Sequence, residues 1–221
     1  MKALLPVLLF LPLFAAAPAY TTKTVKDTVP PKELSAAVRK LLSPECVQLL
    51  DDKGTTLVEL WFCKQIPIEA TEAQIGNGLT YAEVPVSTIL GAVRFEQPWH
   101  DYRKQKIAAG VYTLRIARQP ADGDHMGTAP TTDFCVLCPA ATDKKTDLME
   151  AKALQDLSLT VGDNHPGVVL LFSGKGAGKV PKLVTKNKDH SVLLLELPAK
   201  AGDKKATLKL GLTLVGGSAS R

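Results

Sequence analysis

The chain has 221 residues, of which 45% are hydrophobic and 22% charged, and a formal net charge of +5. This composition is typical of a globular protein and excludes an intrinsically disordered chain. The excess lysines lie late in the chain, where arginine clusters and aromatic residues are almost missing, so the charge does not indicate a nucleic-acid partner.

Residues 1–19 have the pattern of an export signal. Lys2 supplies the positive start, an apolar stretch runs from Leu4 to Phe14, and Ala17-Pro18-Ala19 forms a small-residue cleavage site before Tyr20. The apolar stretch is too short to span a bilayer, and no later run is long enough. We therefore expect a bacterial protein that is exported to the periplasm or secreted, with no transmembrane segment in the mature chain.

Residues 20–43 are expected to form a loose N-terminal arm followed by a helix. Pro30-Pro31 opens this helix, and Leu34, Val38, Leu41 and Leu42 share one face at helical spacing. Pro44 ends it. Residues 44–221 are then expected to form a single β-sandwich domain.

Short apolar or alternating runs separated by turn residues dominate the rest of the chain. Asp51-Asp52-Lys53-Gly54 is a hairpin turn between the first two of these runs. A short inserted helix is expected from Asp147 to Leu157, with Thr146 or Asp147 as its N-cap. The expected strands are Cys46–Leu50, Thr55–Lys64, Ser87–Phe95, Val111–Ala117, Thr132–Leu137, Val168–Phe172, Ser191–Leu197 and Thr207–Val215.

The expected fold is thus mainly β, an antiparallel β-sandwich or jelly roll with one N-terminal helix and one short inserted helix. In the fourth strand Tyr112, Leu114 and Ile116 alternate with Thr113 and Arg115. This alternation predicts a half-buried strand, with its apolar residues on the core.

The chain has four cysteines, Cys46, Cys63, Cys135 and Cys138. In an exported protein they indicate disulfides first, with three possible connectivities, and Cys46 and Cys63 flank the predicted hairpin. Cys135 and Cys138 form a C-x-x-C unit, which leaves thiol redox chemistry and zinc binding as alternatives. Residues three apart in a strand face opposite sides, so this pair fits a redox motif poorly.

The polar loop Asp122-Gly123-Asp124-His125-Met126-Gly127 is the candidate metal site. Asp122, Asp124 and His125 could ligate a divalent metal such as Zn or Cu, with His100 as a further imidazole. The alternative is an ordered turn, in which the aspartates cap backbone amides. Gly174 to Lys179 lacks the spacing of a phosphate-binding loop and is expected to be a hairpin loop. His165 and His190 have the sequence context of turn residues.

Several of these segments together resemble a group of uncharacterised secreted bacterial proteins. The shared residues are Val93-Arg94-Phe95, Trp99, Asp101-Tyr102-Arg103, Gly110-Val111-Tyr112-Thr113-Leu114-Arg115, Gln119-Pro120, Asp122 to Gly127 and Asp133-Phe134. The resemblance covers roughly residues 79 to 140 and implies no assigned activity or cofactor. The group has apolar residues where Cys135 and Cys138 stand, which weakens a redox role for this pair.

Two functions follow from the sequence as hypotheses. The first is a non-enzymatic binding module that takes a ligand or a cell-envelope partner through loops at one end, including the Tyr112 strand and the His125 loop. The alternative is a metal-binding or metal-dependent enzyme site at the Asp122–Met126 loop. No hydrolase motif is present, and the sequence leaves catalysis, the ligand and the oligomeric state open.

Overall fold

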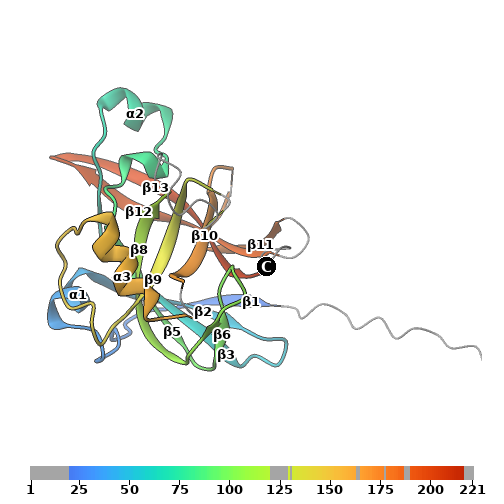
Figure 1. The fold of residues 1–221 in the computed structure, drawn as a ribbon. Coiled ribbons are helices and arrows are strands. Elements are labelled where there is room, and N and C mark those ends of the chain that lie inside the picture. The colour runs from blue at the N-terminus through green and yellow to red at the C-terminus, as the bar shows by residue number, and fades with distance from the viewer. Residues whose placement is uncertain are drawn as a thin grey trace, which may run out of the picture.

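The computed structural model describes residues 20–119, 129, 131–162, 165–176, 178–186 and 190–216. The predicted export signal, residues 1–19, lies outside the described residues. The fold is mainly β, as the sequence predicts, and its centre is one large curled sheet (Figure 1).

This sheet has 11 strands in the order β1-β2-β3-β5-β8-β9-β10-β13-β12-β11, and β4 pairs with β12. Every pairing is antiparallel except that of β4 with β12. The strands are β1 (Thr21–Val25), β2 (Leu42–Leu50), β3 (Thr56–Cys63), β4 (Ile66–Pro67), β5 (Ile89–Phe95), β8 (Gly110–Arg118), β9 (Asp133–Pro139), β10 (Gly167–Ser173), β11 (Lys182–Lys186), β12 (His190–Ala201) and β13 (Lys204–Val215). A separate two-stranded sheet contains β6 (Trp99–His100) and β7 (Lys106–Ile107).

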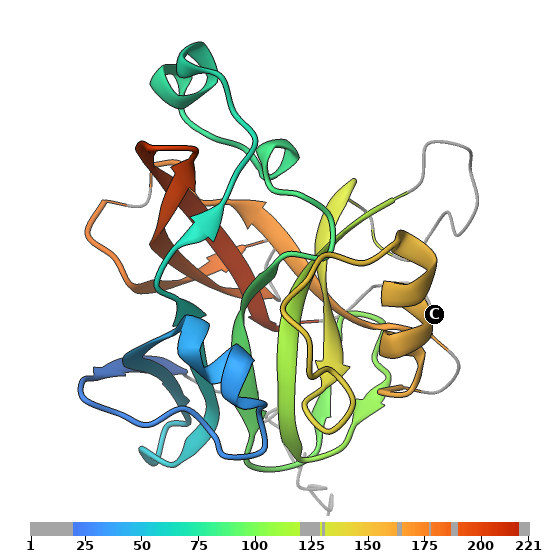
Figure 2. The same ribbon diagram turned by 90° about the vertical axis from the view of Figure 1, so that its left-hand side faces the viewer.

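The curled sheet has two halves, one from β1 to β9 in the strand order and one made of β13, β12 and β11, and two segments join them. The first part of β10 pairs with β9, and its last part, from Leu171, pairs with β13. The segment β3–β4 does the same, because β3 pairs with β2 and β5 while β4 pairs with β12. The sheet therefore bends at both segments, and strands from its beginning and end come together (Figure 2).

The main core fills the interior of this curled sheet. Side chains of a strand alternate between its two faces, so every second residue can reach the interior. Leu193, Leu195 and Leu197 of β12 do so, and Leu195 is opposite Leu210 of β13. One apolar cluster includes these residues together with residues of β2, β3, β5, β8 and β9.

A second apolar cluster lies on the outer face of β8, β9 and β10, under helix α3 (Ala151–Leu159) (Figure 2). Leu154 of α3 is buried there against Phe134, Val136 and Leu170. The helix begins four residues later than predicted. The Asp147 carbonyl, at the predicted start, accepts a hydrogen bond from the buried Arg115.

The N-terminal region differs from the expectation in two respects. The predicted loose arm contains β1, which pairs with β2 over five residues from Thr21 to Val25. The predicted helix at Pro30-Pro31 is confined to α1 (Ala36–Leu41), with Ser35 as its N-cap. Leu42, expected on the helix, is instead the first residue of β2.

Two further helical segments were not predicted, α2 (Glu72–Asn77) and the short 3-10 helix η1 (Tyr81–Glu83). Each begins with a capping box, formed by Thr71 with Gln74 and by Thr80 with Glu83. In the described part of the chain, no helix has the length and hydropathy that a membrane crossing requires.

Candidate functional site

The β6–β7 hairpin covers one opening of the curled sheet. Its turn is held by the buried carboxylate of Asp101, which accepts hydrogen bonds from the backbone N–H and the side-chain amide of Gln105, at 2.9 and 2.8 Å. The same carboxylate accepts a third bond, at 2.9 Å, from the N–H of Val168 in β10. Burial raises the pKa of Asp101, and hydrogen bonds from Val168, Gln105 and the Arg103 backbone oppose this rise. Asp101 therefore anchors the hairpin on β10.

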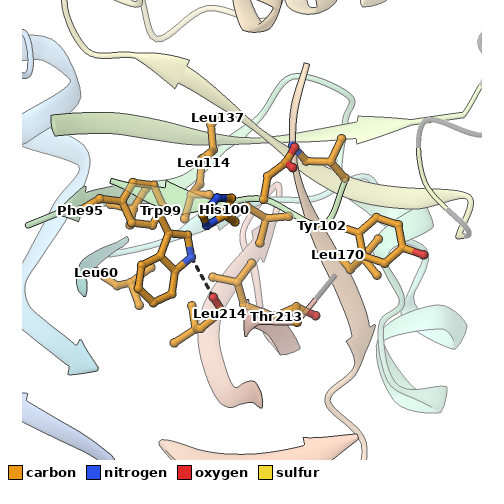
Figure 3. Close-up of a pocket in the computed structure, with 16 residues that line it drawn as sticks. Leu60, Phe95, Trp99, His100, Tyr102, Leu114, Leu137, Leu170, Thr213 and Leu214 are labelled. Atoms are coloured by element: carbon orange, nitrogen blue, oxygen red, sulfur yellow. Dashed lines mark hydrogen bonds between the residues drawn. The ribbon is translucent and has the colours of Figure 1, made fainter. Parts of the chain in front are cut away.

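Trp99 of this hairpin closes the apolar interior (Figure 3). Its ring stacks on Phe95, with ring centroids 5.7 Å apart and an interplanar angle of 12°. Its indole N–H donates to the Leu214 carbonyl oxygen at 3.0 Å, which ties the hairpin to the end of β13. Phe95 in turn contacts Tyr112, whose hydroxyl donates to the Ala108 carbonyl. These aromatic residues have packing roles here.

A small cavity of about 30 Å³ lies beneath the hairpin (Figure 3). Its walls are mainly apolar, with Leu60, Leu114 and Leu212 among them, and it has room for one water molecule. Thr213 also lines it, and the buried Oγ1 of this residue has no hydrogen-bond partner.

A wider depression of about 340 Å³ lies outside the hairpin, and we call it the Trp99 depression. Trp99, His100, Asp101 and Gly216 line both it and the small cavity. Its other lining residues are Tyr20, Pro98, Lys104 and Val215. The half-exposed rings of Tyr20 and Trp99 provide apolar surface, and the exposed side chains of His100 and Lys104 bring basic groups.

His100 is the only one of the four predicted metal ligands that the structure describes. Asp122, Asp124 and His125 lie outside the described residues, so their position relative to His100 is not given. Within the described ranges, no group of three or more His, Cys, Asp or Glu side chains could hold a metal ion. The predicted metal site stays a prediction.

The expected disulfides are absent from the structure, in which all four cysteines are buried free thiols. Cys46 lies opposite Trp61 in the β2–β3 pairing, while Cys63 lies opposite Leu42. Cys135 and Cys138 pack in different apolar clusters, on opposite faces of β9. Burial raises the pKa of each thiol, to about 12 for Cys46, Cys63 and Cys138, so the nucleophilic thiolate is disfavoured.

Arg115 and Asp143 form a fully buried ion pair that the sequence reasoning missed. Arg115 Nε and Nη2 each donate to an Asp143 carboxylate oxygen at 2.8 Å, and Thr113 Oγ1 donates to the same carboxylate. The remaining N–H groups of Arg115 donate to the carbonyls of Ser87, Lys145 and Asp147. The prediction of a half-buried strand is wrong here, because the 140–149 segment covers the second face of β8.

His190, predicted to be a turn residue, instead begins β12. Its ring lies between Tyr102 and Phe172, with centroid distances of 6.1 and 6.0 Å. Both ring nitrogens are buried without a hydrogen-bond partner. This environment marks His190 as a packing residue beside the β6–β7 hairpin.

Comparison of the chain with protein-family models, with curated proteins and with solved structures finds no match. The geometry of the described residues is therefore the basis for any functional conclusion.

Proposed function

We propose that the protein is an exported binding module whose ligand occupies the Trp99 depression. The observation that supports this most is the combination of apolar rings with two basic side chains around one hollow. Its volume of about 340 Å³ falls in the range of small-ligand pockets. The ligand class that fits this lining is a small anionic molecule with a flat apolar group.

The chemistry of the charged groups favours an anion over a cation. Lys104 and His100 are exposed on the rim, and Lys104 has no ion-pair partner among the described residues. The Asp101 carboxylate also lines the depression, but its oxygens accept hydrogen bonds from Gln105, Val168 and the Arg103 backbone. The carboxylate oxygens are therefore already bonded to the protein, and they attract a cationic ligand only weakly.

Two expectations from the sequence belong to this proposal. Export rests on the signal pattern of residues 1–19. A sandwich arrangement is supported by β10 and β3–β4, which each bend from one half of the sheet into the other, as corner strands do between packed sheets.

The experiment is isothermal titration with phenylbutyrate and, as a matched probe of opposite charge, phenylbutylamine. We expect saturable binding of the acid and weaker binding of the amine. Lys104→Asn should weaken the binding of the acid several-fold, because it removes the ammonium group. Asn also suits the positive φ of 63° at this position, so the turn is kept.

Lys53→Ala, on the exposed turn between β2 and β3, is the control and should leave binding unchanged. Equal affinity for acid and amine would refute the assigned ligand class. Lack of saturable binding of either probe at roughly millimolar concentration would count against the site itself.

A further inference from the structure

The residue that follows the predicted cleavage site is held by the sheet. Ala17-Pro18-Ala19 predicts cleavage before Tyr20, and β1 begins one residue later, at Thr21. Chain termini are usually loosely held unless a strand or a helix ties them down. Here β1 pairs with β2 from Thr21 onward, and the side chain of Tyr20 packs against the main core. Cleavage before Tyr20 therefore produces an N-terminus with a defined position.

This N-terminus lies at the Trp99 depression. Tyr20 is one of the residues that line the depression, together with Trp99, His100 and Lys104 of the β6–β7 hairpin. The backbone nitrogen of Tyr20 is thus separated from the depression by no more than the length of its own residue. A charge on this nitrogen acts at the same hollow as the two basic side chains of the rim.

Cleavage changes the charge of this nitrogen. In the uncleaved chain it belongs to the peptide bond between Ala19 and Tyr20 and is neutral. Hydrolysis of that bond consumes one water molecule and leaves a carboxylate on Ala19 and an amine on Tyr20. An α-amino group ordinarily has a pKa of about 7.7–8.0, so most of it is ammonium at pH 7. The mature chain therefore has one more positive charge at the depression than its precursor.

The described charged groups around this amine come from three parts of the fold. Asp51 follows Leu50, the residue opposite Thr21 in the β1–β2 pairing. Both Asp51 and Asp101 already accept hydrogen bonds from backbone N–H groups. The other groups are basic, namely His100 and Lys104 of the hairpin and Lys182 and Lys186 of β11, which lies near β1. The amine thus joins a surroundings in which the carboxylates are bonded to the protein and the basic groups face outward to a ligand.

We propose that the α-ammonium group of Tyr20, formed when the export signal is removed, is a third basic group of the Trp99 depression and binds the anionic end of the ligand together with His100 and Lys104. This inference rests on the proposed function, because it concerns the ligand of the same depression. It adds a form of regulation. The precursor lacks the ammonium group and binds the anion more weakly, so removal of the signal completes the site.

The test compares the mature exported protein with the same protein acetylated on its α-amino group. Acetylation near pH 6.5 selects this amine, because lysine side chains are almost fully protonated there. The acetyl group removes the charge and leaves the chain from Tyr20 onward unchanged, so it separates the charge from the fold. Mass mapping of the N-terminal peptide confirms a single acetyl group. A mature chain that begins at a residue other than Tyr20 would overturn the inference.

The indole resonance of Trp99 reports on the amine without any ligand. The Trp99 N–H donates to the Leu214 carbonyl beside the depression (Figure 3), and the Trp61 indole, which donates to Thr28 beyond the far end of β1, is the internal control. We expect the Trp99 resonance to move with a midpoint at about pH 8 in the mature protein and not in the acetylated protein. The Trp61 resonance should move in neither. Equal movement of Trp99 in both proteins would place the titrating group elsewhere and overturn the inference.

Titration with phenylbutyrate tests the role of the amine in binding. At pH 7 the acetylated protein should bind the acid about two- to fivefold more weakly, the range expected for an exposed ion pair. Between pH 7 and 9.5 the mature protein should lose a similar factor in affinity beyond any loss in the acetylated protein, because only the mature protein has an amine to deprotonate. Phenylbutylamine should bind the acetylated protein at least as well as the mature one.

The outcomes separate this inference from the proposed function. Equal affinity of the mature and acetylated proteins for phenylbutyrate at pH 7 would overturn the role of the amine, while the Trp99 depression would remain an anion site. Lack of saturable binding of the acid by either protein at roughly millimolar concentration would refute the proposed function, and the inference with it.

Discussion

Two arginine–aspartate pairs that involve arginines of β8 provide a direct test of what burial does to an ion pair. In both, the arginine Nε lies 2.8 Å from an aspartate oxygen. The side chains of Arg115 and Asp143 are 0% and 1% exposed, whereas those of Arg118 and Asp133 are 34% and 20% exposed. The Nε–carboxylate distance is thus the same in the two pairs, while their exposure to solvent differs, and the buried pair has a second bond through Nη2 of Arg115.

We expect Asp143→Ala to lower the free energy of unfolding by about 3–5 kcal/mol, because it leaves the Arg115 charge buried without a partner. Asp133→Ala should lower it by about 1 kcal/mol or less, because water can solvate Arg118. A stability change of 1 kcal/mol moves Tm by about 2–4 °C in a domain of this size. The first variant should therefore melt about 6–20 °C lower.

The assay is urea unfolding followed by tryptophan fluorescence, with thermal melting as a second measurement. Asp143→Asn, which keeps the side-chain volume, separates the charge effect from the loss of packing. It should remain close to Asp143→Ala in stability, since Arg115 still lacks its counter-charge. Similar losses for the Asp143 and Asp133 variants would refute the argument that burial sets the cost.

Three further predictions concern other parts of the molecule. Gly91→Ala would place its Cβ 2.4 Å from the Trp61 carbonyl oxygen, so it should lower the free energy of unfolding, measured with urea, by about 1–3 kcal/mol. At Gly76 a new Cβ meets no atom within 4 Å, so Gly76→Ala should be neutral or stabilising by about 0.5–1 kcal/mol. Burial raises the pKa of the Cys46, Cys63 and Cys138 thiols from 9.0 to about 12, so the folded state keeps protons that the unfolded chain releases. Each thiol should therefore make its full contribution to the free energy of unfolding below pH 9, and this contribution should fall by about 1 kcal/mol per pH unit above pH 9. A free energy of unfolding that does not change between pH 9 and 10 would contradict this. If Asp122, Asp124 and His125 bind Zn or Cu, elemental analysis of the natively purified protein should find stoichiometric metal that His125→Ala loses.

Local turn chemistry could be predicted from the sequence because it depends on neighbouring residues. In the Asp51–Gly54 turn, the Asp51 carboxylate accepts hydrogen bonds from the N–H groups of Lys53 and Thr55, and Gly54 has a φ of +80°. These are the properties for which such residues occur in turns. The same holds for β9, where strand alternation predicts that Cys135 and Cys138 face opposite sides, as the two apolar clusters confirm.

The burial of β8 on both of its faces could not be predicted from the sequence, because it depends on segments that are far apart in the chain. The pattern of β8 alone assigns Arg115 to a solvent-exposed face. Only the 140–149 segment, which brings Asp143 over that face, changes its environment. The Trp99 depression has the same origin, since Trp99 and Val215 come together through contacts that no local pattern contains. His100 was a candidate from the sequence, whereas Lys104 and Tyr20 were not.

The short parallel pairing of β4 with β12 has a consequence for how the chain folds. Ile66 and Ala199, which this pairing joins, are separated by more than half of the chain. The entropy lost in closing so long a loop makes such contacts slow to form, and proteins rich in them fold slowly. We therefore expect β4 and β12 to meet late, after the local hairpins. Until then the apolar interior stays accessible to solvent.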